Sequence, residues 1–277
     1  MPGKPLDPSS PRALLGAELR VARERASLSQ AALGEKLFVS GSYVGQMEAG
    51  TRRITLELAT AIDQVLGTDG FFTRNCGKQG KSKYPEHFVE AAEAEAEARA
   101  IREYAPLVVP GLLQTEAYAR EIFHAYQPTA PQAVIDQLTE ARLDRAKLLS
   151  DPTTPLFWCV FDEAALRRVV GSPAVMAEAM RHIADFIRAR RIIVQALPFS
   201  AGAHASVGGS LKLMDFEDAP PLAYIEGNGT GMLLDDPSQV AHHSLTYDLL
   251  TASALSPRES LALIESMAED YAHDQHA

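Results

Sequence analysis

Small and polar residues follow one another on the outward face of a short predicted helix. Residues 29–50 read SQAALGEKLFVSGSYVGQMEAG, and Ser40 is placed to cap a helix whose apolar residues Val44 and Met47 fall three apart. The outward positions near the start of that helix are Gly41, Ser42, Gly45 and Gln46. A glutamine amide can pair with adenine through two hydrogen bonds, and a serine hydroxyl can also contact base edges. The pattern therefore predicts a recognition helix that lies in the major groove of DNA.

Other predicted helices must hold this helix in position. The preceding one is capped by Ser29 and contains Gly34, a small residue where two helices approach closely. Two arginines, Arg52 and Arg53, follow the glycine-containing stop of the recognition helix and can hold phosphates. Apolar stripes predict a first and a closing helix, at Leu15, Leu19, Ala22, Leu56, Leu58, Ala59, Ile62, Val65 and Leu66. Four to five short helices in about 60 residues are typical of one helix-turn-helix module.

The stretch 13–67 resembles the Xre family of bacterial and phage repressors. The shared features are the Ser-Gln start of the second helix, its small residue, the Val-Ser turn and the Glu-x-Gly-x-Arg exit. The resemblance implies that double-stranded DNA is bound and that bases are contacted by Gly41, Ser42 and Gln46. It implies that phosphates are contacted by Gln30, Tyr43, Thr51, Arg52 and Arg53. It also implies a structural ion pair that ties the first helix to the third, between Arg23 and Glu48.

This sequence departs from the family at two glycines. Gly41 and Gly45 have no side chain, so direct reading of bases falls mostly on Gln46 and Ser42. We therefore expect modest specificity per half-site, supplemented by DNA shape or by dimerisation. A homodimer is expected because operator palindromes mirror two-fold proteins. The alternative is a small helical bundle without DNA contact, which the two arginines beside a capped helix disfavour.

The charge of the chain is unevenly distributed. The whole chain has a net charge of −10, whereas residues 1–70 contain eight Lys or Arg and eight Asp or Glu. The remaining residues therefore carry the whole net negative charge. A general nucleic-acid binder is instead basic. A neutral module with a local basic edge fits specific DNA binding with weak non-specific affinity and strong salt sensitivity.

Length and composition predict two domains. We expect a disordered lead at 1–11, a helix-turn-helix domain at 12–68, a linker at 69–84 and a second domain at 85–277. The basic run 74–83 is either a solvated linker or an arm on the DNA backbone. Cys76 and Cys159 have no metal-type spacing, and no apolar run approaches the ~18 residues of a membrane span. A reduced, cytoplasmic protein without a signal peptide or membrane segment is expected.

Strand and helix patterns alternate in the second domain. Strands are predicted at 155–161, 192–198, 210–216 and 222–226. Helices are predicted at 86–104, 116–126, 131–149, 163–170, 174–190, 237–253 and 257–272. The predicted fold is an all-α helix-turn-helix bundle followed by an α+β domain with a small, mainly antiparallel sheet.

The second domain shows a resemblance of its own. Over residues 85–273, the segments LVVPGLLQTEAYAR, FDEAALRRVVG, VQALPFSAGAHASVGGSLKLMDF and ALSPRESLALIESMA are similar to a group of actinomycete regulators. That group comprises WhiJ-like, antitoxin-like Xre proteins, often encoded beside a small acidic partner protein. The resemblance implies cytoplasmic regulation of development or antibiotic production. It also implies a domain that receives a small protein or a small-molecule signal.

Groups that could support catalysis in this domain have simpler explanations. The glycine-rich run 206–210 lacks the Lys-Ser/Thr ending of a phosphate loop and precedes a strand. His204 has no Ser or Cys partner at a suitable spacing, and Asp162 with Glu163 fits a helix cap. The histidine pairs at 242–243 and 273–276 make no closed metal site. We therefore expect no catalytic residue, no metal and no cofactor.

Two hypotheses follow from the sequence. The first is a DNA-binding transcription regulator whose second domain receives a signal, from a small partner protein or a small ligand. The second is a small-molecule-binding protein or enzyme with an N-terminal docking module. The loop 198–209 and the segment 109–114 are expected to form the receiving surface, because both combine apolar residues with strand ends. The residues assigned to that surface are Val109, Leu112, Gln114, Phe199 and His204.

Overall fold

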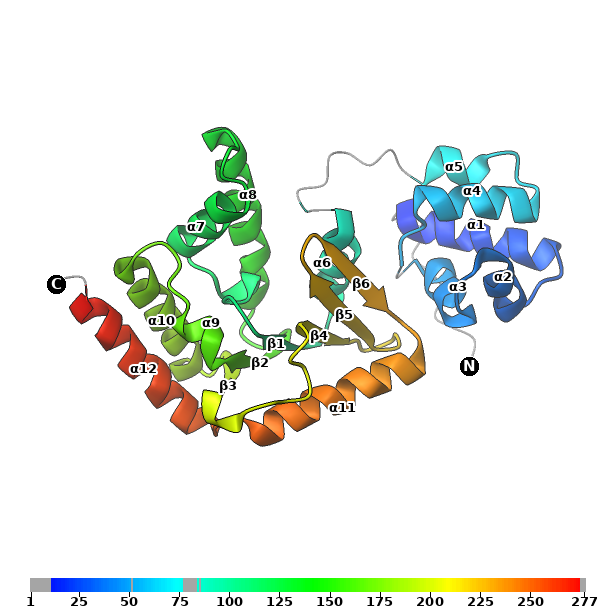
Figure 1. Ribbon diagram of the computed structural model, residues 1–277. Helices are drawn as coiled ribbons and strands as arrows, with labels where there is room; N and C mark the ends of the chain where they lie inside the picture. Colours follow the sequence, from blue (N-terminus) through cyan, green and yellow to red (C-terminus); the bar gives the residue numbers. More distant parts are fainter. Residues whose placement is uncertain (1–10, 51, 77–83, 85, 275–277) are drawn as a thin grey trace. The chain divides into compact units, whose positions relative to one another are not determined.

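A computed structural model describes residues 11–50, 52–76, 84 and 86–274 of the chain (Figure 1). The chain forms two compact units, residues 1–82 with 235–237 and residues 83–234 with 238–277. The predicted lead before Pro11, Thr51 and most of the predicted basic run at 74–83 lie outside the described residues. Each unit has a hydrophobic core of its own.

The described part of the first unit is a bundle of short helices. They are α1 (Pro11–Arg25), α2 (Gln30–Leu37), α3 (Gly41–Glu48), α4 (Leu56–Leu66) and α5 (Phe71–Asn75). The side chains of Ser29, Ser40 and Thr55 cap α2, α3 and α4 by accepting backbone N–H groups at 3.1, 3.0 and 3.2 Å. The buried apolar core consists of Leu19, Leu33, Leu37, Val44, Met47, Ile54, Ala59, Ile62 and Phe72. The expected all-α helix-turn-helix bundle is therefore confirmed.

The turn between α2 and α3 depends on a small residue. A Cβ atom added to Gly34 would lie 2.6 Å from the carbonyl oxygen of Val39. Any larger side chain would push the turn away from α2, so the predicted close approach at Gly34 is confirmed. Phe38 ends α2 in the left-handed region, with φ of 58°, and its side chain is almost fully exposed.

A six-stranded sheet forms the centre of the second unit. Its strands are β1 (Ala100–Ala105), β2 (Leu156–Asp162), β3 (Ile192–Leu197), β4 (Ser210–Asp215), β5 (Leu222–Gly227) and β6 (Thr230–Leu234). The strand order is β3-β2-β1-β4-β5-β6. The ladders that join β1, β2 and β3 are parallel, and the three that join β1, β4, β5 and β6 are antiparallel. The sheet is thus mixed, and the expected α+β class is confirmed.

Helices cover both faces of this sheet (Figure 1). On one face, alternate residues such as Phe157, Cys159 and Phe161 pack against the helices α6 (Val89–Glu97), α10 (Pro173–Arg188) and α12 (Pro257–His273). On the other face, residues such as Val160 and Leu213 pack against α11 (Pro237–Ser253). The remaining helices are α7 (Glu116–Tyr126), α8 (Gln132–Ala146) and α9 (Glu163–Arg167). This alternation along each strand is what a sheet buried on both faces requires.

The prediction of one long helix over 86–104 was wrong. Helix α6 ends at Glu97, and Ala100–Ala105 forms the central strand β1. Its backbone pairs with β2 on one side and with β4 on the other, and Ile101 and Tyr104 become buried on opposite faces. Pairing with distant strands therefore outweighs the helix preference of an Ala- and Glu-rich segment. Strand β6 was also missed by the sequence pattern.

Candidate nucleic-acid interface

Gln46 lies on α3 but is less exposed than its predicted outward position implies. Its side chain is 7% exposed, and its Oε1 atom accepts a hydrogen bond from Arg52 Nη1 at 3.2 Å. The backbone N–H of Arg52 donates to the carbonyl oxygen of Gln46 at 3.1 Å. Reading a base through Gln46 therefore requires its amide to exchange the contact with Arg52 for a contact with DNA.

Arg52 is also held by an aromatic ring. Its guanidinium carbon lies 3.7 Å from the centroid of the Tyr43 ring, within the range of cation–π attraction. The structure thus brings together Gln46, Tyr43 and Arg52, three of the residues predicted to contact DNA. Arg53 follows as a partly exposed arginine, and Ser42 is partly exposed near the start of α3. Arg52 itself is only 7% exposed, and its Nη1 atom lies 3.3 Å from Asp235 Oδ2, so a phosphate must displace this carboxylate to pair with the guanidinium.

The two glycines of α3 have packing roles. A Cβ atom at Gly41 would lie 3.0 Å from the Cα atom of Ala31, and one at Gly45 would lie 3.3 Å from the side-chain oxygen of Gln30. Both positions therefore allow α3 to lie close to α2. This close approach explains why side chains that could read bases are missing there, and it gives the predicted base contact Gly41 a structural function.

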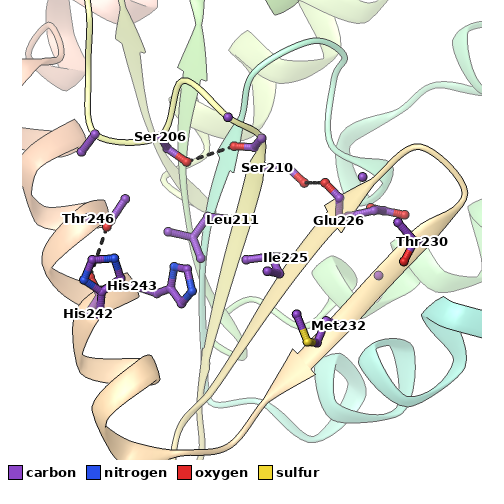
Figure 2. Close-up of a pocket in the computed structure, with 15 residues that line it drawn as sticks. Ser206, Ser210, Leu211, Ile225, Glu226, Thr230, Met232, His242, His243 and Thr246 are labelled. Atoms are coloured by element: carbon purple, nitrogen blue, oxygen red, sulfur yellow. Dashed lines mark hydrogen bonds between the residues drawn. The ribbon is translucent and has the colours of Figure 1, made fainter.

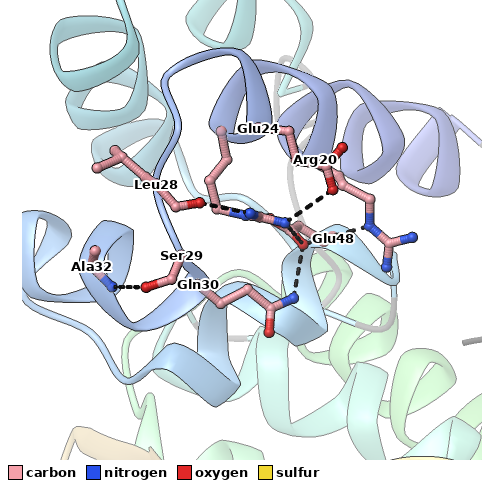
Figure 3. A network of polar contacts seen from close by, with 8 residues as sticks. Arg20, Glu24, Leu28, Ser29, Gln30, Ala32 and Glu48 are labelled. Carbon is pink, nitrogen blue, oxygen red and sulfur yellow. Dashed lines mark hydrogen bonds and ion pairs between the residues drawn. The ribbon is translucent and has the colours of Figure 1, made fainter. Parts of the chain in front are cut away.

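Arg23 and Glu48 form the ion pair expected between α1 and α3 (Figure 3). Arg23 donates to both carboxylate oxygens, through Nε to Oε1 and through Nη2 to Oε2 at 3.0 Å. Its Nη1 atom donates to the carbonyl oxygen of Leu28 at 2.8 Å. The hydrogen bond to Glu48 raises the pKa of Arg23, although burial opposes this shift. Glu48 is completely buried, so this network fixes the angle between α1 and α3.

Gln30 belongs to the same network. Its Nε2 atom donates to Glu48 Oε2 at 2.8 Å, which joins the start of α2 to the end of α3 (Figure 3). The prediction placed Gln30 on a DNA phosphate. In the structure its amide is partly exposed and supports the ion pair.

Three residues assigned to the receiving surface belong to the core, so that part of the prediction was wrong. Val109, Leu112 and Gln114 are 0%, 1% and 3% exposed. Gln114 donates to the carbonyl oxygen of Val109 at 2.7 Å and accepts from Arg142 at 2.5 Å. The backbone N–H of Val109 donates to the buried Tyr118 hydroxyl at 3.1 Å, so both backbone polar groups of Val109 are satisfied by buried side chains and not by solvent.

Phe199 and His204 lie nearer the surface. Phe199 is largely exposed, and His204 Nε2 lies 3.2 Å from the hydroxyl of Tyr104 and 3.5 Å from Asp162 Oδ2. The Tyr104 hydroxyl donates to Asp162 at 3.0 Å. Burial, and to a smaller extent the negative charge of Asp162, raises the pKa of Tyr104 far above its ordinary value. Tyr104 therefore stays protonated at neutral pH. Asp162 also caps α9 by accepting the N–H of Ala164 at 2.8 Å, as the sequence predicted.

Sequence reasoning missed a group of charged residues beneath the sheet. Lys212 Nζ lies 2.6 Å from Glu95 Oε1 and 3.2 Å from Glu103 Oε2, and Arg145 Nη1 lies 3.5 Å from Glu95 Oε2. Burial raises the pKa of Glu103, whereas Lys212 and Arg145 overcome burial and lower the pKa of Glu95. These residues are spread over α6, β1, β4 and α8, so no local spacing could have revealed the cluster.

Comparison with known families gives a match for each unit. Residues 14–70 match a helix-turn-helix domain, the domain type of DNA-binding regulators. Residues 88–266, more than half of the chain, match a family described as a domain of unknown function (DUF5753), and the chain belongs to that family. Comparisons with curated proteins and with solved structures gave no match.

Two features are absent from the described residues. No helix among them is both long and apolar enough to cross a membrane. Across the same residues, no group of three or more His, Cys, Asp or Glu side chains is arranged to hold a metal ion.

Proposed function

We propose that this protein is a sequence-specific transcription regulator that binds double-stranded DNA through α3. The observation that carries the proposal is the cluster of Gln46 and Tyr43, on the helix that Ser40 caps, with Arg52, which follows that helix. Gln46 and Ser42 contact bases, and the Arg52 and Arg53 side chains with Gln30, Tyr43 and Thr51 contact phosphates. The Arg23–Glu48 pair holds α1 and α3 at the angle that this contact needs.

The proposal extends to the second unit and to the assembly. The protein acts in the cytoplasm as a homodimer on a palindromic operator, and the second unit receives a signal without a catalytic step. By resemblance to WhiJ-like, antitoxin-like regulators of actinomycetes, the signal comes from a small acidic protein encoded nearby. Two observations support a receiving role: this unit has a core of its own, and it matches a family distinct from the helix-turn-helix domain.

Fluorescence anisotropy on DNA from upstream of the protein's own gene tests the DNA-binding proposal. Wild type is expected to prefer this DNA over a scrambled duplex, with an affinity that falls steeply as salt rises. Gln46→Ala is expected to lose about 1–3 kcal/mol of specific binding, because the amide supplies the main base contact. Arg258→Ala, which removes an exposed positive charge from α12, is the matched control and should bind as wild type does. Equal, weak binding of both duplexes by wild type would refute the proposal.

A further inference from the structure

A groove lies on the second unit between α11 and the β5–β6 hairpin (Figure 2). It has a cavity volume of about 420 Å³. A second cavity, also about 420 Å³, continues along the same helix and shares Ile225, Met232, His242 and His243 with the first. Each cavity is large enough for a drug-sized molecule, whose sites span roughly 300–1,000 Å³. Both are lined entirely by residues of the second unit.

The floor of the groove is apolar. Leu211 is buried, Ile225 is partly buried, and Met232 is 54% exposed on the strand β6. These three side chains project from neighbouring strands toward the sheet face on which α11 lies (Figure 2). An exposed, flexible methionine at the side of an apolar hollow is a feature of surfaces that adapt to bound molecules.

The rim of the groove presents hydrogen-bond acceptors. Ser206 donates its hydroxyl proton to the carbonyl oxygen of Gly209 at 3.0 Å, and Ser210 donates to that of Glu226 at 3.2 Å. Thr246 donates to the carbonyl oxygen of His242 at 3.1 Å. Because each hydroxyl has one proton, a molecule in the groove meets these oxygen atoms as acceptors. Donor groups of a bound molecule can therefore pair with these oxygen atoms.

The charge of the lining excludes anions. No lysine or arginine occurs among the described residues that line either cavity. The carboxylate of Glu226 lies 3.5 Å from His87 of the preceding segment. Burial, with the neighbouring His242, lowers the pKa of His243, so that ring is neutral at pH 7. The two imidazole rings, with centroids 5.4 Å apart, lie at 69° to each other in an edge-to-face arrangement.

We propose that this groove binds an uncharged, amphipathic small molecule. Its planar apolar body lies on Leu211, Ile225 and Met232, and its hydroxyl or amide N–H groups donate to the rim. The claim that this molecule is the signal of a regulator rests on the proposed function. The claim that the groove binds the molecule does not. The loop 198–209, which the sequence assigned to the receiving surface, contributes to this groove. The loop residues that line the groove include Ser206, Gly208 and Gly209, whereas the predicted Phe199 and His204 do not line it.

Nile red, an uncharged planar dye that fluoresces in apolar surroundings, is the probe for the full-length protein. Wild type is expected to bind it saturably at one site. Gly208→Phe should weaken binding by about tenfold or more, because Gly208 lines the groove and a Cβ atom there meets no atom within 4 Å, which leaves room for the added ring at the site. Val207→Phe is the matched control, since Val207 is largely exposed and does not line the groove. Equal affinities of these two variants, or no saturable binding by wild type, would overturn the proposal.

A second pair of variants tests the apolar floor and the charge. Met232→Asp should weaken Nile red binding by about tenfold, whereas Leu245→Asp, an exposed apolar residue of α11 outside the groove, should not. The anionic dye 8-anilinonaphthalene-1-sulfonate should bind more weakly than Nile red at pH 7. Tighter binding of the anion, sensitive to Gly208→Phe, would overturn the uncharged assignment. Unfolding midpoints equal to that of wild type confirm that the variants are folded.

Promoter DNA binding measured on the same samples separates the two proposals. Promoter-specific binding without saturable dye binding removes the groove proposal and leaves the regulator. Saturable dye binding that depends on Gly208, without promoter binding, removes the regulator and leaves the groove as a ligand site.

Discussion

The two units bury carboxylates in different ways. In the first unit, Glu48 accepts hydrogen bonds from Arg23 and Gln30 at both of its oxygen atoms. In the second unit, Glu95 and Glu103 share Lys212, and Glu95 also lies near Arg145. Among the described residues, Glu95 Oε2, Glu103 Oε2 and Arg145 Nε are buried without a hydrogen-bond partner. Glu48 in the first unit is thus satisfied by the geometry of its hydrogen bonds, whereas Glu95 and Glu103 in the second unit rely on nearby opposite charge.

This difference affects how strongly each unit depends on a single residue. A carboxylate with several directional donors retains some partners when one is removed. A cluster whose charges neutralise one another without complete hydrogen bonding depends on every member, because one removal leaves an uncompensated charge in a low-dielectric core. We therefore expect the second unit to be the more sensitive of the two to a single charge deletion.

The largest effect is expected for Lys212→Met. This change leaves Glu95 and Glu103 without the cation between them and should lower the free energy of unfolding of the second unit by about 3–5 kcal/mol. Chemical denaturation monitored by tryptophan fluorescence measures it, because the single Trp158 lies in β2 of the same sheet. Lys147→Met is the matched control, since Lys147 is exposed and solvent screens its pair with Asp144, which should therefore contribute little to stability. A loss no larger than that of the control would mean that the cluster tolerates an uncompensated charge.

The same contrast explains which parts of the molecule could be predicted from sequence. Helices α2 and α3 have the predicted starts because Ser29 and Ser40 cap them through atoms three residues away. Strand β1 was mistaken for helix because its pairing partners, such as Phe157 and Met214, are far along the chain. Local chemistry is readable in a sequence, but partners that only tertiary pairing brings together are not.

Candidate site residues follow the same rule. The expected pairing of Arg23 with Glu48 rested on a known helix arrangement, and the structure places the two side chains together. Val109 and Gln114 were expected at a surface because their segment combines apolar residues with a strand end, yet a buried tyrosine and Arg142 satisfy that segment from other elements. The charged cluster around Lys212 was missed because each member, taken alone, is typical of a solvated surface.

A smaller effect is expected for Asp63→Asn, at a buried acid that forms no ion pair with the described residues. Asp63 accepts the backbone N–H groups of Phe72 at 3.0 Å and Thr73 at 2.8 Å, and the hydroxyls of Thr68 and Thr73, which tie α5 to α4. An asparagine would turn a donor toward these donors, so we expect the first unit to lose about 2 kcal/mol at pH 7. Amide hydrogen exchange at Phe72 and Thr73 measures this loss in the full-length protein.

The effect of Asp63 should depend on pH. Burial would raise the pKa of Asp63, but the hydrogen bonds from Thr68, Thr73 and Phe72 outweigh burial and lower it below 3.8. The folded-state pKa is therefore below the unfolded one, so the stabilisation is complete above pH 3.8 and is lost as the pH falls through the folded-state value. The difference between wild type and Asp63→Asn should narrow in that range. A difference that stays constant down to pH 3 would show that Asp63 titrates as it does in the unfolded chain.

The smallest effect tests whether geometry or charge stabilises the first unit. Arg23→Lys keeps the positive charge near Glu48 but loses the paired donation to the carboxylate and the bond to the Leu28 carbonyl oxygen. We expect a loss of about 1 kcal/mol, because Gln30 still donates to Glu48 and the charge is retained. Arg20→Lys is the matched control, since Arg20 is largely exposed, lies 3.6 Å from the same carboxylate and should contribute almost nothing.

If both variants keep the stability of wild type, charge alone suffices at Glu48 and the contrast with the Lys212 cluster disappears. If Arg23→Lys also weakens binding of promoter DNA while Arg20→Lys does not, the orientation of α1 against α3 affects DNA binding as well as folding.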